Sequence, residues 1–222
     1  MMTNLFTIFD PSSPPIFSLN WLALSMPILV LPSLFFLTPS KYQSVFKNIP
    51  LFLQKEMKLL LSTSFQKGST LILISIFLFI IWNNFMGLLP YIFTATSHLL
   101  ISLSLALPIW LTLMLFGWLW NSFKMFSHLV PLGTPMALAS FMVCVETISN
   151  LIRPITLSVR LSANMIAGHL ILTLLSNCFS LNLLSSFILL PETALILLET
   201  AVAIIQAYVF TILITLYSTE IH

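Results

Sequence analysis

Charged residues are scarce in this chain of 222 residues: Asp, Glu, Lys and Arg make up 6% of it, against 59% hydrophobic residues. A soluble domain carries roughly 25% charged residues, so this chain lacks the side chains needed to cover a water-facing surface. A soluble enzyme is therefore excluded. Intrinsic disorder is excluded too, because disordered chains are charged and poor in aromatic residues, whereas 19 Phe and 5 Trp occur here. A polytopic membrane protein remains.

Cysteine is also scarce, and the glycine-rich loop that binds phosphate is absent. The two cysteines, Cys144 and Cys178, lie in apolar runs and are interpreted as buried thiols, which indicates neither a disulfide framework nor a metal site. No glycine-rich loop followed by Lys-Ser or Lys-Thr occurs, so we expect the chain to bind no nucleotide. We expect no cofactor. The N-terminus resembles neither a signal peptide nor a transit segment, which for an organellar protein favours synthesis inside the organelle.

Long apolar runs are what the chain does contain. A membrane helix needs about 20 apolar residues, so the sequence predicts an all-α fold with about five membrane-crossing helices. The expected spans cover about 16–37, 70–90, 98–120, 136–175 and 187–217. We expect a single integral membrane domain over 1–222, in three parts: 1–68, 69–135 and 136–222.

Basic residues gather between the first two expected spans. Five of the eight lie there, alternating with apolar residues: Lys41, Lys47, Lys55, Lys58 and Lys67. This pattern favours an amphipathic helix in the membrane interface over a solvated loop. By the positive-inside rule, this segment and the loop around Lys124 lie on the inner side. The segments 1–15 and 91–97 then lie outside, together with the N-terminus, and the C-terminus lies inside.

The last third predicts a strongly tilted helical hairpin. The run 136–175 contains Pro154 but no turn cluster. As one helix, ~40 residues at ~1.5 Å each give ~60 Å, twice the ~30 Å thickness of the hydrocarbon core. Such a helix must lie far from the membrane normal, well beyond the usual tilt of about 20°. The polar stretch 176–186 is the expected turn, and the run 187–217 returns.

Each arm of this hairpin carries polar residues at a spacing of seven. The first arm has Glu146, Arg153 and Arg160, and Asn164 widens the same face. The second has Glu192, Glu199 and Gln206. Seven helical residues return to within ~20° of the starting direction, so each set forms one stripe. Because ionisable groups in hydrocarbon are costly, they are interpreted as functional.

An antiparallel hairpin pairs positions whose residue numbers have a constant sum. Arg160 with Gln206 and Glu146 with Glu220 both sum to 366, and His169 with Glu199 sums to 368. All three centre on the expected turn. The pairing places His169 and Glu199 towards the outer side, Arg160 and Gln206 in the middle, and Glu146 towards the inner side.

This order of residues indicates proton handling. His and Glu can titrate and relay protons, whereas Arg stays charged even when buried. We therefore interpret the stripes as two proton half-paths separated by a fixed positive charge, with a partner subunit supplying a carboxylate between them. Arg153 could instead pair internally or snorkel, and His169 could be a core histidine. Glu192 and Glu220 could be merely interfacial.

At these residues the chain resembles the a subunit family of rotary F-type ATP synthases, in its animal mitochondrial form. The resemblance covers essentially the whole chain. It includes the segments ETISNLIRP at 146–154, RLSANMIAGH at 160–169, QAYVF at 206–210 and WNNFMGLLP at 82–90. It implies a non-catalytic stator subunit of the Fo sector, in the mitochondrial inner membrane, with two proton half-channels beside a rotating ring of c subunits. Peripheral-stalk and accessory membrane subunits and lipid are the further partners implied.

The resemblance also implies residue roles. Arg160 matches the family's essential arginine, and Asn164 and Gln206 match its polar neighbours. His169 and Glu199 match the pair on the uptake side, and Glu146 matches an acid on the release side. Three other functions are alternatives to this one. A haem-binding electron carrier needs paired intramembrane histidines, a secondary transporter often shows repeated halves, and a structural scaffold has no need of Arg160.

Overall fold

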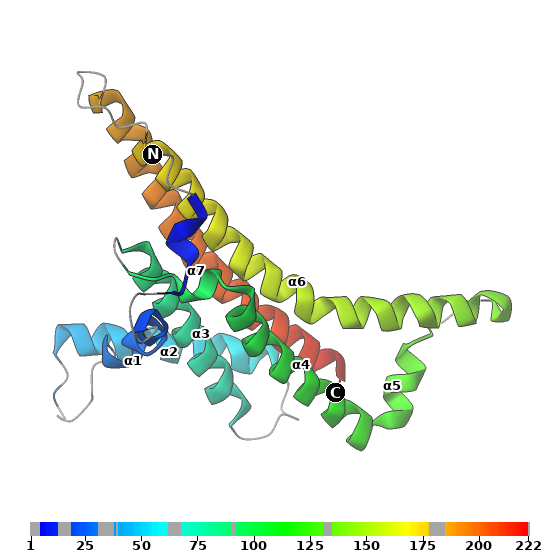
Figure 1. Cartoon of the computed structure of the whole chain (residues 1–222). Coiled ribbons are helices and arrows are strands. Elements are labelled where there is room, and N and C mark those ends of the chain that lie inside the picture. Colours follow the sequence, from blue (N-terminus) through cyan, green and yellow to red (C-terminus); the bar gives the residue numbers. More distant parts are fainter. Residues whose placement is uncertain are drawn as a thin grey trace.

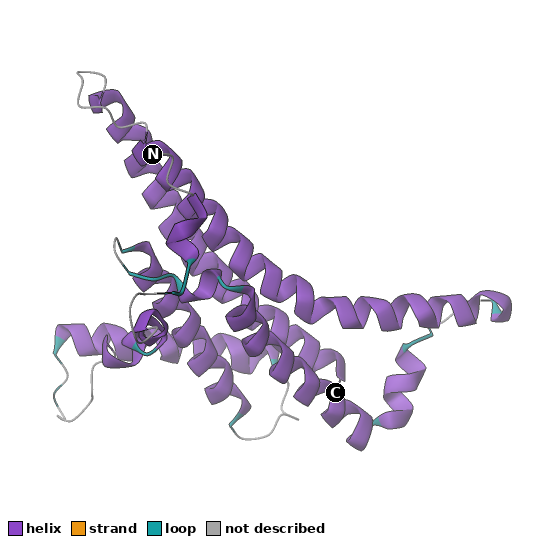
Figure 2. Cartoon of the chain, in the orientation of Figure 1, coloured by secondary structure: helices purple, strands orange, loops and turns teal. Residues whose placement is uncertain are grey.

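The computed structural model describes most of the chain: residues 5–12, 19–30, 38, 40–61, 68–89, 92–130, 135–177 and 185–221. Over these ranges the secondary structure consists of α-helices and short 3-10 helices, with no strand (Figure 2). The expected all-α fold is confirmed.

Four helices in the described part are long and apolar enough to cross a membrane. They are α3 (Ser69–Leu88), α4 (Leu99–Trp120), α6 (Met136–Asn177) and α7 (Ser185–Ile221). Each matches an expected span to within a few residues. The polytopic membrane fold is therefore confirmed.

The first expected span, 16–37, is described only in its middle. There the chain forms the 3-10 helix η2 (Leu19–Leu24) and the short helix α1 (Met26–Val30). The rest of that span lies outside the described residues. So does the expected turn of the hairpin over 178–184.

The expected amphipathic helix is α2 (Lys41–Leu60); residues 62–67 of its predicted range lie outside the described part. Ser40 begins the helix with a capping box. Its Oγ accepts a hydrogen bond from the Gln43 amide at 3.3 Å, and the Gln43 side chain accepts one from the Ser40 amide at 3.0 Å. Leu53 and Met57 are buried on one face, whereas the four lysines of the helix are exposed.

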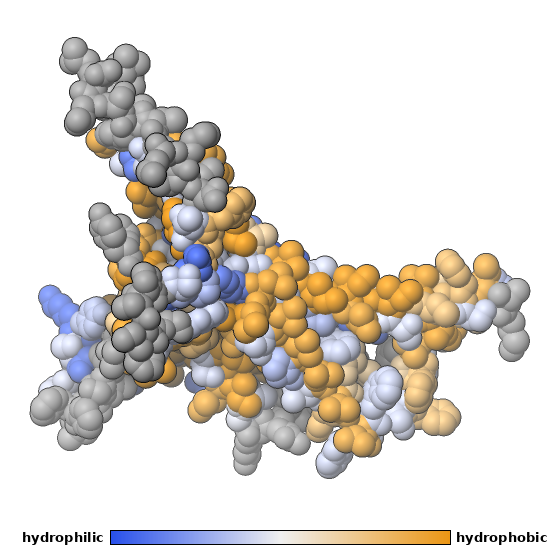
Figure 3. All heavy atoms as spheres, viewed as in Figure 1, coloured by the Kyte–Doolittle hydropathy of each residue, from blue (hydrophilic) through white to orange (hydrophobic). Residues whose placement is uncertain are grey.

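The core lies where α3, α4, α6 and α7 meet. Ile80 of α3 and Ala207 of α7 are fully buried, and Leu161 of α6 is 2% exposed. Outside this core many large apolar side chains are exposed, and Figure 3 shows them spread over the flanks of the helices. Such a surface suits hydrocarbon, because lipid tails are as apolar as these side chains.

Helix α6 is continuous but changes direction along its length (Figure 1). One part runs beside α7, and the other projects away from the bundle towards the short helix α5 (Ser122–His128). Pro154 is the one proline inside α6. Its ring removes a backbone N–H donor and clashes with the preceding turn, which is the usual cause of a bend.

Aromatic side chains pack the N-terminal region against the loop between α3 and α4. The ring of Trp21 lies 5.8 Å from Phe93 and 5.4 Å from His98, measured between centroids. The 3-10 helix η3 (Ala95–Ser97) lies in this loop. Residues 19–24 and 92–98 therefore lie at the same end of the bundle.

Candidate functional site

Two contacts fix the register of the α6–α7 hairpin. A Cβ atom built on Gly168 would lie only 2.6 Å from Cδ of Glu199 and 3.1 Å from its Cγ. The guanidinium of Arg153 lies over the ring of Tyr217, 4.7 Å from its centroid. The residue numbers of the first pair sum to 367, within the 366 to 368 expected from the polar stripes, and those of the second sum to 370, two above that range.

Gly168 determines how closely the Glu199 carboxyl group can approach α6. Any larger residue at this position would occupy the space of that group. Glu199 is 6% exposed and borders a cavity of about 190 Å³ between the two helices. Asn164, one helical turn from Gly168, lines the same cavity. The structure thus brings Asn164 and Glu199 together, whereas the sequence pairs Glu199 with His169 and groups Asn164 with Arg160.

His169 follows Gly168 and lies at the same end of the hairpin, but it is not hydrogen-bonded to Glu199. Oε1 of Glu199 and Nε2 of His169 are both buried, and neither has a hydrogen-bond partner among the described residues. Buried polar atoms of this kind are uncommon and call for an explanation. The imidazole of His169 is covered by the ring of Phe9, which meets it edge-on at 6.4 Å and 80°.

Arg160 lies near the middle of α6 and is exposed. Its neighbours Val159 and Ile155 are 42% and 45% exposed, so this face of α6 is not covered by the described part of the chain. Gln206 is half-buried on α7. In the described part of the chain, no hydrogen bond joins Arg160 and Gln206.

On the other half of the hairpin, Glu146 is half-buried. The side chain of Glu220, its expected partner, lies outside the described part. The cation–π contact of Arg153 with Tyr217 shows how this half packs. It agrees with the interpretation of Arg153 as internally paired.

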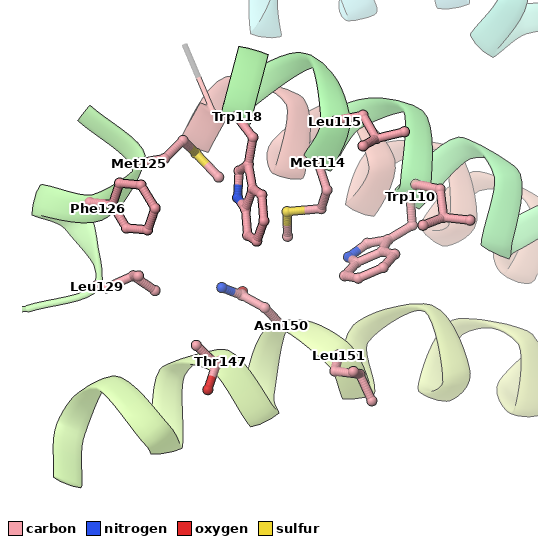
Figure 4. Close-up of a pocket in the computed structure, with 11 residues that line it drawn as sticks. Trp110, Met114, Leu115, Trp118, Met125, Phe126, Leu129, Thr147, Asn150 and Leu151 are labelled. Atoms are coloured by element: carbon pink, nitrogen blue, oxygen red, sulfur yellow. The ribbon is translucent and has the colours of Figure 1, made fainter. Parts of the chain in front are cut away.

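Asn150 belongs to a different environment. It lines a cavity of about 360 Å³ between α4, α5 and α6, together with Thr147 and nine apolar residues. Figure 4 shows its side chain pointing from α6 into this cavity, towards Trp118 of α4 and Leu129. Asn150 therefore faces the neighbouring helices, whereas Arg160 faces outward.

Sequence reasoning missed three of these residues. Gly168 is the one glycine in α6. A glycine inside a helix costs about 1 kcal/mol of helix stability relative to alanine, so its presence indicates that packing requires it there. Tyr217 could have been found by extending the constant-sum pairing to Arg153. Nothing in the sequence around Phe9 indicates its contact with His169.

Comparison with known proteins gives one consistent family. Residues 15–219 match the family model of the ATP synthase A chain. ATP synthase subunit a of Drosophila melanogaster is 58% identical over 224 residues and that of Aedes aegypti 54% over 226. That of Anopheles quadrimaculatus is 56% identical over 226 residues. Each alignment covers 100% of both chains. With its helical membrane fold and the polar hairpin formed by α6 and α7, this chain belongs to the ATP synthase A chain family.

Proposed function

We propose that this chain is the stator subunit of the Fo sector that provides two offset proton half-channels beside a rotating ring of c subunits. Proton flow through them is coupled to rotation of the ring and hence to ATP synthesis. The subunit is not itself catalytic and binds no nucleotide. The exposed Arg160 in the middle of an apolar membrane helix is the observation that carries this proposal.

A guanidinium in the middle of a membrane-spanning helix needs an acidic partner. Translocon scales give about 2.5–3.5 kcal/mol for an arginine at the centre of a membrane helix, and buried charges are normally paired. Glu199, the acid nearest to it in the pairing of the two arms, is buried against Gly168 instead, so we infer that the acid comes from another chain. A ring of c subunits that presents carboxylates to the uncovered face of α6 meets this need.

The uptake path is proposed to pass His169, Glu199 and Asn164. The cavity of about 190 Å³ beside Glu199 is large enough for several water molecules, at about 30 Å³ each. Such water would bridge the unpartnered atoms of His169 and Glu199, and the two groups would then share a proton as a coupled pair. From there the proton reaches the ring carboxylate near Arg160.

The release path is proposed to run along the other half of the hairpin. After the ring has turned, its carboxylic acid loses the proton beside Arg160, whose positive charge favours the ionised form. Gln206 and Glu146 then conduct the proton away. Because Arg160 cannot give up its own proton, the two half-paths stay separate.

The proposed setting is the mitochondrial inner membrane. The N-terminus faces the intermembrane space and the C-terminus faces the matrix, as the distribution of basic residues predicts. The partners are the c-ring, the peripheral-stalk and accessory membrane subunits, and lipid.

The test is Arg160→Lys in the intact ATP synthase. We expect proton-driven ATP synthesis to be largely lost although the formal charge is kept, because Lys lacks the planar fork and can lose its proton in a low-dielectric site. Arg153→Lys is the matched control, since a lysine can still lie over the ring of Tyr217. Near-normal coupled synthesis by Arg160→Lys would contradict the proposal.

A further inference from the structure

The N-terminal segment lies against the half of the α6–α7 hairpin that carries His169. Figure 1 shows the 3-10 helix η1 (Leu5–Phe9) beside these two helices. Its last residue, Phe9, meets the imidazole of His169 edge-on at 6.4 Å. The segment is also tied to η2, because Nδ2 of Asn20 donates a hydrogen bond to the Pro11 carbonyl at 3.4 Å.

Asp10 follows Phe9 and is the one charged residue among the first 40. Its side chain is exposed, and Oδ1 accepts a hydrogen bond from the Ser12 amide at 3.0 Å. This bond and a second one from the Ser12 side chain lower the pKa of Asp10 below its usual value. The carboxylate is therefore ionised at neutral pH.

We propose that the segment 5–12 forms the outer mouth of the proton path, in which Phe9 covers the His169 imidazole and Asp10 draws protons towards it. This inference rests on the proposed role of His169 in proton uptake. A proton leaves the outer water, is attracted by the Asp10 carboxylate and binds to the imidazole, and the carboxylate is left unchanged. Asp10 acts here through its charge.

The size of the electrostatic effect of Asp10 follows from the distance between its carboxylate and the imidazole of His169. Asp10 directly follows Phe9, the residue whose ring contacts the imidazole, so its charge acts over a separation on the order of 10 Å. At that distance in water, one negative charge raises the local proton activity roughly twofold. Salt screens the interaction, since the Debye length is about 8 Å at physiological ionic strength and about 3 Å at 1 M.

Other titratable groups on the elements around this mouth are His169 on α6, Glu192 and Glu199 on α7, and His98 next to η3. All four are buried or half-buried. Buried charges are screened much less than exposed ones. A salt-sensitive contribution to proton uptake therefore distinguishes Asp10 from them.

The experiment measures proton-driven ATP synthesis by the intact complex in vesicles, as a function of outer pH, at low salt and at 1 M salt. For Asp10→Asn we expect about twice the outer proton concentration to be needed for half-maximal synthesis at low salt. The two curves should coincide at 1 M salt. Asp10→Glu is the matched control, because it keeps the charge and should keep the wild-type curve. ATP hydrolysis by the detached catalytic sector should be unchanged in all variants.

Two results would overturn the inference. One is an Asp10→Asn curve identical to wild type at low salt, and the other is a shift that persists at 1 M salt, which would indicate a structural role. His169→Gln, measured in parallel, tests the proposed function separately. Impaired uptake in His169→Gln with no effect of Asp10→Asn would reject only the role of Asp10, whereas unimpaired uptake in His169→Gln would reject the uptake path itself.

Discussion

A hydrogen atom in place of a side chain at position 168 lets the Glu199 carboxyl group lie directly on the backbone of α6. Glycine is an unfavourable residue inside a helix, by about 1 kcal/mol relative to alanine. Its use here is explained by the atoms of Glu199 that would be within 2.6 to 3.1 Å of a Cβ. Packing and proton chemistry therefore depend on the same position.

We predict that Gly168→Ala displaces the Glu199 carboxyl group without unfolding the hairpin. The atoms that must move are the far end of a flexible side chain, and alanine favours the helix. Assembly should be normal, whereas proton-driven ATP synthesis should fall several-fold. Both are measured on the purified complex, by native gel and by coupled synthesis in vesicles.

Glu199→Asp in the Gly168→Ala background is the matched rescue, because the shorter side chain leaves room for the added methyl group. We expect the double variant to recover part of the lost activity. Additive losses from the two changes would show that the contact between these positions does not control the carboxyl group.

At the scale of single elements, α2 depends on how it begins. Ser40 and Gln43 exchange two hydrogen bonds that satisfy amides left unpaired at the start of the helix. We predict that Ser40→Ala destabilises this first turn by about 1 kcal/mol. Amide hydrogen exchange over the first turn of α2 should then be about fivefold faster, since 1–2 kcal/mol corresponds to a factor of 5–30.

Ser44→Ala provides the control. Its hydroxyl donates only to the Lys41 carbonyl within the same helix, at 2.7 Å, and caps nothing. Exchange in the first turn should be almost unchanged in this variant. Equal acceleration by both changes would mean that the capping box does not hold the start of α2.

The elements themselves could be predicted well because hydrophobic length is a strong signal. The apolar runs predict the bounds of α3, α4, α6 and α7 to within a few residues. The seven-residue spacing of Glu146, Arg153 and Arg160 predicts which face of α6 carries these polar side chains. The hairpin register also followed from polar residues alone, because few positions in hydrocarbon can hold them. The short helix α5, in contrast, was expected as part of a loop, since seven residues give too little periodicity to recognise.

Contacts between distant segments could not be predicted in this way. Phe9 and His169 are 160 residues apart in the sequence, so their contact depends on how the N-terminal segment packs against the hairpin. An apolar residue such as Phe9 carries no signal of which distant residue it will contact. Asn150 shows the same limit. It lies four residues after Glu146 on α6, yet it lines a cavity with Trp110 and Trp118 of α4.

At the scale of the whole molecule, the hairpin has two ends with different polar groups. Glu199 and His169 lie at one end, and Glu146 lies on the other half. With the proposed orientation, Glu146→Gln should slow proton release to the matrix side more than proton uptake from the outside. Partial proton-transfer reactions in vesicles of known orientation measure the two steps separately.

Glu199→Gln is the control for this measurement, because it should show the opposite pattern, with uptake more affected than release. A Glu146→Gln defect confined to uptake would mean that the chain crosses the membrane in the opposite sense. Equal effects of Glu146→Gln on both steps would contradict a separate release path.

The uncovered Arg160 also has a consequence for how the protein is made. A newly inserted copy that has folded alone holds its guanidinium against lipid, at a cost of a few kcal/mol. The cost disappears when an acidic partner covers that face of α6. With the proposed c-ring as that partner, we expect folding of the chain to be completed only by assembly, so that a copy inserted without the ring is less stable than an assembled one.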